Sequence, residues 1–118
     1  MEIRVERGKG RTKGRHCKAS IDGAMTIYSA AAGKTALLDA LAGSAELEID
    51  LSAVTEMDTA GLQLLVMIKR EAVGRGKLVR LAAHSATSLE VLDLYNLVAH
   101  FGDPVVISSR AKARRAKD

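Results

Sequence analysis

The sequence predicts a single α/β domain: a mixed, mainly parallel sheet of four to five strands, packed with about three to four helices. Apolar and polar residues alternate over 16–21, 45–51 and 77–83, as in strands that bury one face. Segments with helical spacing of apolar residues separate these strands, which is typical of β-α-β crossovers. A chain of 118 residues has room for one hydrophobic core and is too short for two domains.

The ends of the chain differ from this body. Asp22-Gly23 predicts a tight hairpin between strands near 16–21 and 24–28, which would add an antiparallel pair to the sheet. Residues 1–15 include the glycine-rich, basic run GKGRTKGR and are expected to form a flexible basic arm. We therefore place the domain at residues 16–108, with a last short edge strand at 104–108 and a basic tail at 109–118.

Three helices are expected between and after the strands. The first covers about 29–43, with Ser29 as a candidate N-cap and a glycine at its end. The second, over 60–73, has the clearest apolar periodicity and stops at GRGK. The third covers 85–98 and begins with hydroxyl-bearing residues. The predicted order is thus β-β-α-β-α-β-α-β.

Composition and charge exclude several functional classes. Residues 1–18 carry seven Lys or Arg against two Glu, and 110–118 carry five against one Asp. Because the total is +4, the body between them is acidic, unlike a uniformly basic nucleic-acid binder. Basic termini are more often solvated extensions, so nucleic acid is not the expected partner. No long apolar run or signal-peptide pattern occurs, so no membrane span is expected and the predicted location is cytoplasmic.

The chemistry-bearing residues do not assemble into a catalytic or metal site. The single cysteine, Cys17, excludes an internal disulfide and any multi-cysteine metal site. His16, His84 and His100 are far apart in sequence and lack carboxylates at metal-ligand spacing. His16 and Cys17 point to opposite faces of their predicted strand, which argues against a Cys–His nucleophile. GKGRTKGR lacks the spacing of a phosphate-binding loop, so neither enzymatic activity nor a cofactor is expected.

One short turn stands out between the strand at 45–51 and the helix at 60–73. Asp58-Thr59-Ala60-Gly61 places a carboxylate and a hydroxyl where the helix begins. Asp and Thr are favoured helix caps. A hydroxyl at a helix start is also exposed, and the nearby N–H groups and macrodipole favour a phosphate there. The residues alone leave both interpretations open, a cap or a phosphorylation site.

Two segments, DLSAVTEMDTAGLQLL at 50–65 and GKLVRLAAHSATSLEVLDLYNL at 76–97, resemble the STAS domain, the family of anti-sigma factor antagonists, with the likeness covering about residues 20–107. Its most specific element is D-[ST]-[SA]-G-L after a strand. The resemblance implies a regulatory module that binds an anti-sigma factor with serine/threonine kinase activity, with Thr59 as phosphoacceptor. The chain would act as a monomer or weak dimer. The implied partner-binding residues are Asp58, Thr59, Ala60, Gly61, Gln63, Met67 and Arg70.

Two alternatives remain. Thr59-Ala60 stands where phosphorylated members of the family commonly have Ser-Ser. DTAGL is also similar to STAS subunits of bacterial phospholipid-transport ABC complexes, which implies a subunit that docks on an ABC ATPase. A third interpretation, from a different class, is a module that binds nucleic acid through its basic ends, which would show as a steep loss of binding with salt.

Overall fold

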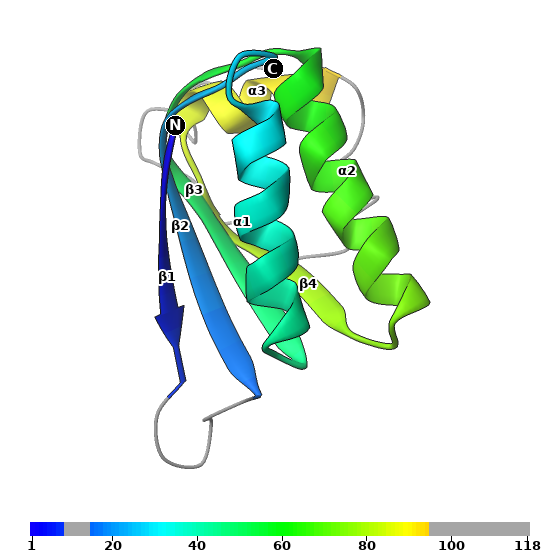
Figure 1. Cartoon of the computed structure of the whole chain (residues 1–118). Coiled ribbons are helices and arrows are strands. Elements are labelled where there is room, and N and C mark those ends of the chain that lie inside the picture. Colours follow the sequence, from blue (N-terminus) through cyan, green and yellow to red (C-terminus); the bar gives the residue numbers. More distant parts are fainter. Residues whose placement is uncertain (9–14, 95–118) are drawn as a thin grey trace.

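The computed structural model describes residues 1–8 and 15–94, which form a four-stranded mixed sheet with helices packed on it (Figure 1). Strand β1 pairs antiparallel with β2, whereas β2–β3 and β3–β4 are parallel, in the spatial order β1-β2-β3-β4. The predicted fold class is confirmed. The elements are β1 (Glu2–Arg7), β2 (His16–Met25), α1 (Ala30–Ala42), β3 (Glu46–Met57), α2 (Thr59–Gly74), β4 (Leu78–His84) and α3 (Ala86–Leu94).

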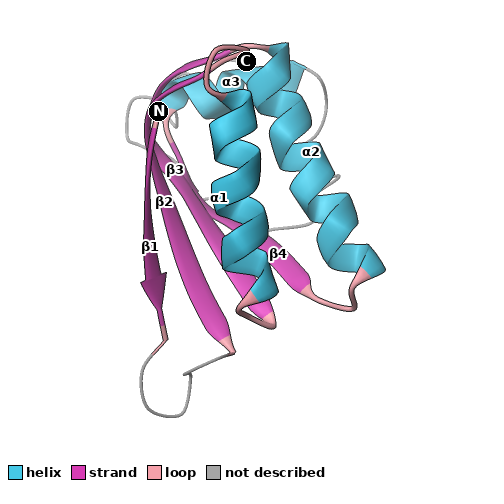
Figure 2. Ribbon diagram, viewed as in Figure 1, coloured by secondary structure: helices cyan, strands magenta, loops and turns pink. Residues whose placement is uncertain are grey.

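Helices α1 and α2 lie side by side over one face of the sheet, and α3 lies at the end where the parallel strands finish (Figure 2). Alternate residues of each parallel strand are buried, as the sequence pattern predicted. They share one core with the apolar faces of the helices. Its largest fully buried side chains include Ile21, Met25, Leu37, Leu41, Leu47, Ile49, Leu51, Leu65, Ile68, Leu81 and Leu92.

The expected flexible arm over residues 1–15 is wrong in its first half, because Glu2–Arg7 forms β1. This strand pairs with β2 from Glu2 opposite Asp22 to Arg7 opposite Cys17. Met1 and Ile3 are partly buried and pack against the core. The antiparallel pair that makes the sheet mixed is therefore β1 with β2, and the domain begins earlier than residue 16.

The predicted hairpin at Asp22-Gly23 is also wrong, because β2 continues through it to Met25. Gly23 has φ +93°, a backbone conformation that glycine adopts at low cost. The register between β2 and β3 shifts on both sides of this position, so the dipeptide marks an irregularity in a continuous strand. Ile27 and Tyr28, predicted to end a strand, lie in the loop that leads to α1.

Four predictions lie outside the described residues: the arm over 9–14, the end of the third helix, the edge strand at 104–108 and the tail at 109–118. Among the described helices, none is long and apolar enough to cross a membrane.

Candidate functional site

The turn that the sequence singled out lies at the carboxyl ends of β2 and β3. Met25 and Met57 are opposite each other at the last paired position of these two parallel strands. The backbone N–H of Asp58 donates to the carbonyl oxygen of Met25 at 3.2 Å. Because both strands end here, the β2–α1 loop, defined as residues 26–29, and the first turn of α2 are neighbours.

Asp58 is the N-cap of α2. It has extended backbone angles, and its Oδ1 accepts hydrogen bonds from the N–H groups of Ala60 at 2.9 Å and Gly61 at 3.1 Å. Its other oxygen, Oδ2, accepts from the N–H of Ile27 at 3.0 Å. The Ile27 hydrogen bond, together with those from the helix, holds the pKa of the Asp58 carboxyl below its ordinary value of 3.8. The carboxylate therefore belongs to both the helix start and the β2–α1 loop.

Thr59 is the first residue of α2 and is exposed. The side chain of Asp58 accepts the capping hydrogen bonds, so the cap role predicted for the turn belongs to the aspartate. The position of Thr59 at the positive end of a 16-residue helix favours an anion on its hydroxyl. The geometry thus separates the two interpretations of the turn by residue: Asp58 caps, and Thr59 presents its side chain to solvent.

Gly61 is buried where α2 passes the end of β2. A Cβ at this position would lie 2.3 Å from the Met25 carbonyl oxygen and 2.9 Å from the Met25 Cβ. The motif's glycine therefore allows a close approach between helix and strand. Gly61 itself is buried, so its effect on the exposed turn is to set the position of Thr59 relative to the end of β2.

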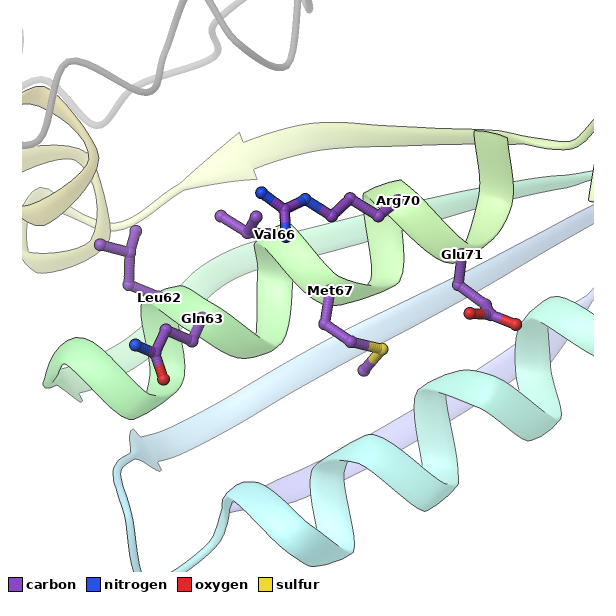
Figure 3. Close-up of a pocket in the computed structure, with 6 residues that line it drawn as sticks. All are labelled: Leu62, Gln63, Val66, Met67, Arg70 and Glu71. Carbon is purple, nitrogen blue, oxygen red and sulfur yellow. The ribbon is translucent and has the colours of Figure 1, made fainter. Parts of the chain in front are cut away.

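The remaining residues of the implied binding face divide between two sides of α2. Gln63 and Met67 point toward α1 in Figure 3. Together with Ala60 they line a shallow hollow of about 310 Å³, whose other wall is Ala30, Ala31 and Lys34 of α1. Arg70 lies on the side away from α1, beside Val66 (Figure 3). Both sides contribute to a second open hollow along α2, lined by Leu62, Gln63, Val66, Met67, Arg70 and Glu71.

The β2–α1 loop adjoins this turn and was not predicted from the sequence. Ile27 is 69% exposed and Tyr28 is 97% exposed, although both are large apolar side chains. The signal was present in the sequence, since two large apolar residues stand directly before Ser29. Ser29 occupies the N-cap position of α1 without capping it: its hydroxyl accepts from the Thr26 N–H at 3.0 Å and donates to the Ala24 carbonyl at 2.9 Å. The Ser29 hydroxyl thus joins the end of the loop to Thr26 and to the carbonyl of Ala24 in β2.

The other residues considered from the sequence lie elsewhere. Cys17 is fully buried, and burial raises the pKa of its thiol, with the Arg7 charge opposing that shift. The neighbouring His16 lies on the opposite, partly exposed face of β2. His84 is buried at the end of β4, and His100 is outside the described residues. Within residues 1–8 and 15–94, no three His, Cys, Asp or Glu side chains cluster as a metal site.

Comparisons with known proteins agree with this fold. A family model described as "Mlab, STAS domain" matches residues 10–103. An anti-sigma factor antagonist from Mycobacterium paratuberculosis is similar in structure, with a TM-score of 0.73 and 22% identity over 99% of this chain and 94% of that one. The anti-sigma factor antagonist SpoIIAA in its unphosphorylated form has a TM-score of 0.65 and 11% identity, over 98% and 97% of the two chains.

Bacillus SpoIIAA in its phosphorylated form also has a TM-score of 0.65, with 9% identity over 99% of this chain and 100% of that one. At identities this low, the structural similarity establishes a likeness of fold alone. Comparison with curated proteins gave no match.

Proposed function

The chain belongs to the STAS domain family, and we propose that it is a non-enzymatic binding module that engages an anti-sigma factor with serine/threonine kinase activity and is switched by phosphorylation of Thr59. The observation that carries this proposal is the position of Thr59, exposed at the first position of α2 beside the capping carboxylate of Asp58. The structural neighbours support the class, since two are described as anti-sigma factor antagonists and the third is SpoIIAA in its phosphorylated form.

The charges around Thr59 give the switch a physical basis. Lys34 lines the hollow beside Ala60 and Gln63, whereas Arg70 is exposed on the other side of α2 (Figure 3). The Lys34 charge suits an acidic contact surface on the partner. Phosphorylation adds about −1.5 to −2 charges at Thr59, next to the carboxylate of Asp58. An acidic partner surface would then be repelled, and binding would be lost.

The test is to purify the protein from its host with phosphatases inhibited and to measure intact and peptide masses. We expect one phosphate on the peptide that contains Thr59. The variant Thr59→Val should lose it, whereas Thr55→Val should keep it, because Thr55 is an exposed threonine on β3 outside the proposed site. A phosphate that persists in Thr59→Val, or no phosphate under any growth or stress condition, contradicts the proposal.

A second candidate function is a subunit that docks on an ABC ATPase. The observation that favours it is the Thr59-Ala60 pair, which stands where phosphorylated relatives commonly have Ser-Ser. In that case the same surface of α1 and α2 would bind the ATPase whatever the state of the hydroxyl. Thr59→Glu separates the two functions: it should weaken binding to a kinase partner at least tenfold, a loss of about 1.4 kcal/mol. It should leave an ATPase that docks constitutively bound nearly as before.

A further inference from the structure

We propose that Asp58 holds the β2–α1 loop in position and that a phosphate on Thr59 releases this loop, so that Ile27 and Tyr28 are displaced when the site is modified. The proposal rests on the proposed function for the identity of the modified residue. It adds a second effect to the switch, because the phosphate would change the shape of the surface as well as its charge.

The two oxygens of the Asp58 carboxylate accept hydrogen bonds from different segments of the chain. Oδ1 of Asp58 accepts from Ala60 and Gly61, which are its neighbours in α2. Oδ2 accepts from the N–H of Ile27, which lies 31 residues earlier in the chain. The two oxygens therefore join the first turn of α2 to the β2–α1 loop. Any change in the charge or rotamer of Asp58 acts on both.

Hydrogen bonds around Thr26 hold the β2–α1 loop in a compact turn. The N–H groups of Ser29 and Ala30 both donate to the Thr26 carbonyl, at 3.0 and 2.9 Å, and the Ser29 hydroxyl accepts from the Thr26 N–H. These bonds make the loop one compact turn with Ile27 and Tyr28 at its tip. Both side chains extend into solvent, so their burial contributes little to holding the tip. The bond from the Ile27 N–H to Asp58 ties that tip to α2.

A phosphate on Thr59 would place a second anion beside the Asp58 carboxylate. Thr59 follows Asp58 directly, so a phosphate on its hydroxyl lies beside the carboxylate and near the same helix N–H groups. The repulsion between the two anions grows as the distance between them falls. Of the three backbone donors to Asp58, Ile27 is the one outside α2, so a carboxylate that turns away from the phosphate and keeps its bonds to the helix loses the bond to Ile27. Loss of that bond frees the tip of the loop, next to the hollow lined by Ala30 and Ala60.

The full-length chain tests this without any partner. We would measure hydrogen exchange of individual backbone amides by NMR in the wild type, in Asp58→Asn and in protein with phosphothreonine at position 59. Asparagine keeps one carbonyl oxygen for the amides of Ala60 and Gly61, while its NH₂ group cannot accept from Ile27. Thr35→Glu is the matched control, since it adds an anion at an exposed site on α1.

We expect the Ile27 amide to exchange about tenfold faster or more in Asp58→Asn and in the phosphothreonine protein, the factor that loss of a hydrogen bond to a charged group implies. The amides of Ala60 and Gly61 should stay close to wild type in Asp58→Asn, and Thr35→Glu should leave Ile27 unchanged. Unchanged exchange at Ile27 in either modified protein overturns the proposal, as does an equal acceleration in Thr35→Glu. Because the phosphothreonine protein retains Asp58, misfolding of Asp58→Asn would still leave a decisive measurement.

The two proposals fail in different ways. Absence of phosphate from Thr59 in the host refutes the proposed function and does not alter these exchange rates. Conversely, a phosphate found in the host together with an unresponsive Ile27 amide retains the charge switch and refutes the displacement of the loop.

Discussion

Replacing Gly61 by alanine tests the claim that this glycine is required by packing. The added Cβ would lie 2.3 Å from the Met25 carbonyl oxygen, whereas real Cβ contacts essentially never fall below 3.0 Å, so α2 and β2 must separate by at least the 0.7 Å difference. The obstructing atoms are the carbonyl group and the Cβ of Met25, which move only with the backbone, and that carbonyl already accepts from the Asp58 N–H. A small rotation of a side chain cannot relieve this contact.

The cost follows from two opposing effects. Overpacking a well-packed site costs about 1–3 kcal/mol. Alanine in a helix interior gains up to about 1 kcal/mol over glycine. Gly74, at the other end of α2, is the matched control, because a Cβ there meets no atom within 4 Å. We expect Gly74→Ala to be neutral or stabilising, and Gly61→Ala to be less stable than Gly74→Ala by about 1–3 kcal/mol.

Urea unfolding of the three proteins, followed by circular dichroism, measures these differences as changes in the midpoint at constant slope. If Gly61→Ala proved as stable as Gly74→Ala, the close approach of α2 to Met25 would be refuted. A changed slope in Gly61→Ala alone would show a change in the compactness of the native or denatured state or a loss of two-state unfolding, and the comparison of midpoints would then be replaced by calorimetry.

Four further predictions concern stability and reactivity. Lys77 Nζ donates to two carbonyls at the end of α1, at 2.7 and 3.2 Å, so Lys77→Met should cost about 0.5–1.5 kcal/mol in urea unfolding. Arg75→Met, which removes an exposed i,i+4 pair, should cost less than about 0.5 kcal/mol. Burial raises the pKa of Asp50, but the hydrogen bonds from Ser52 and the nearby Lys18 charge together lower it by more. The net pKa lies below the ordinary 3.8. At acid pH the unfolded chain therefore binds more protons at Asp50 than the folded chain does. The unfolding free energy should fall as pH drops through 3.8 towards the lower folded pKa, and it should fall less in Asp50→Asn. Cys17 should react with a thiol reagent at a rate set by unfolding, and equal rates in buffer and in denaturant would contradict its burial.

The parallel part of the fold was predictable because its sequence pattern reports burial directly. Residues that alternate over β2, β3 and β4 are the ones that the structure buries. Strand β1 was missed because its sequence, EIRVER, is mostly charged and lies at the edge of the sheet. Its pairing depends on β2, which the local sequence does not contain. The hairpin prediction at Asp22-Gly23 was wrong because a glycine with positive φ occurs both in tight hairpins and at irregularities within a continuous strand.

The candidate site was predictable in part for a similar reason. The start of α2 follows from local chemistry, since an aspartate before a helical pattern is a strong N-cap. The bond between Asp58 and the Ile27 N–H joins residues that are 31 positions apart, and no local pattern encodes it. The division of Gln63 and Met67 from Arg70 depends on where α1 packs, which is a property of the assembled layers.

Asp58, Thr59 and Gly61 contribute differently to the fold, and this difference decides which substitutions can test function. Asp58 supplies the cap and the tie to Ile27, and Gly61 permits the contact with Met25. Any STAS domain with this helix entry needs such residues whether or not it is phosphorylated, so their presence argues for the fold. The exposed side chain of Thr59 is under no comparable packing constraint. Substitutions at Asp58 or Gly61 would disturb structure and function together, whereas Thr59→Val and Thr59→Glu change the chemistry of the site while the helix entry stays intact.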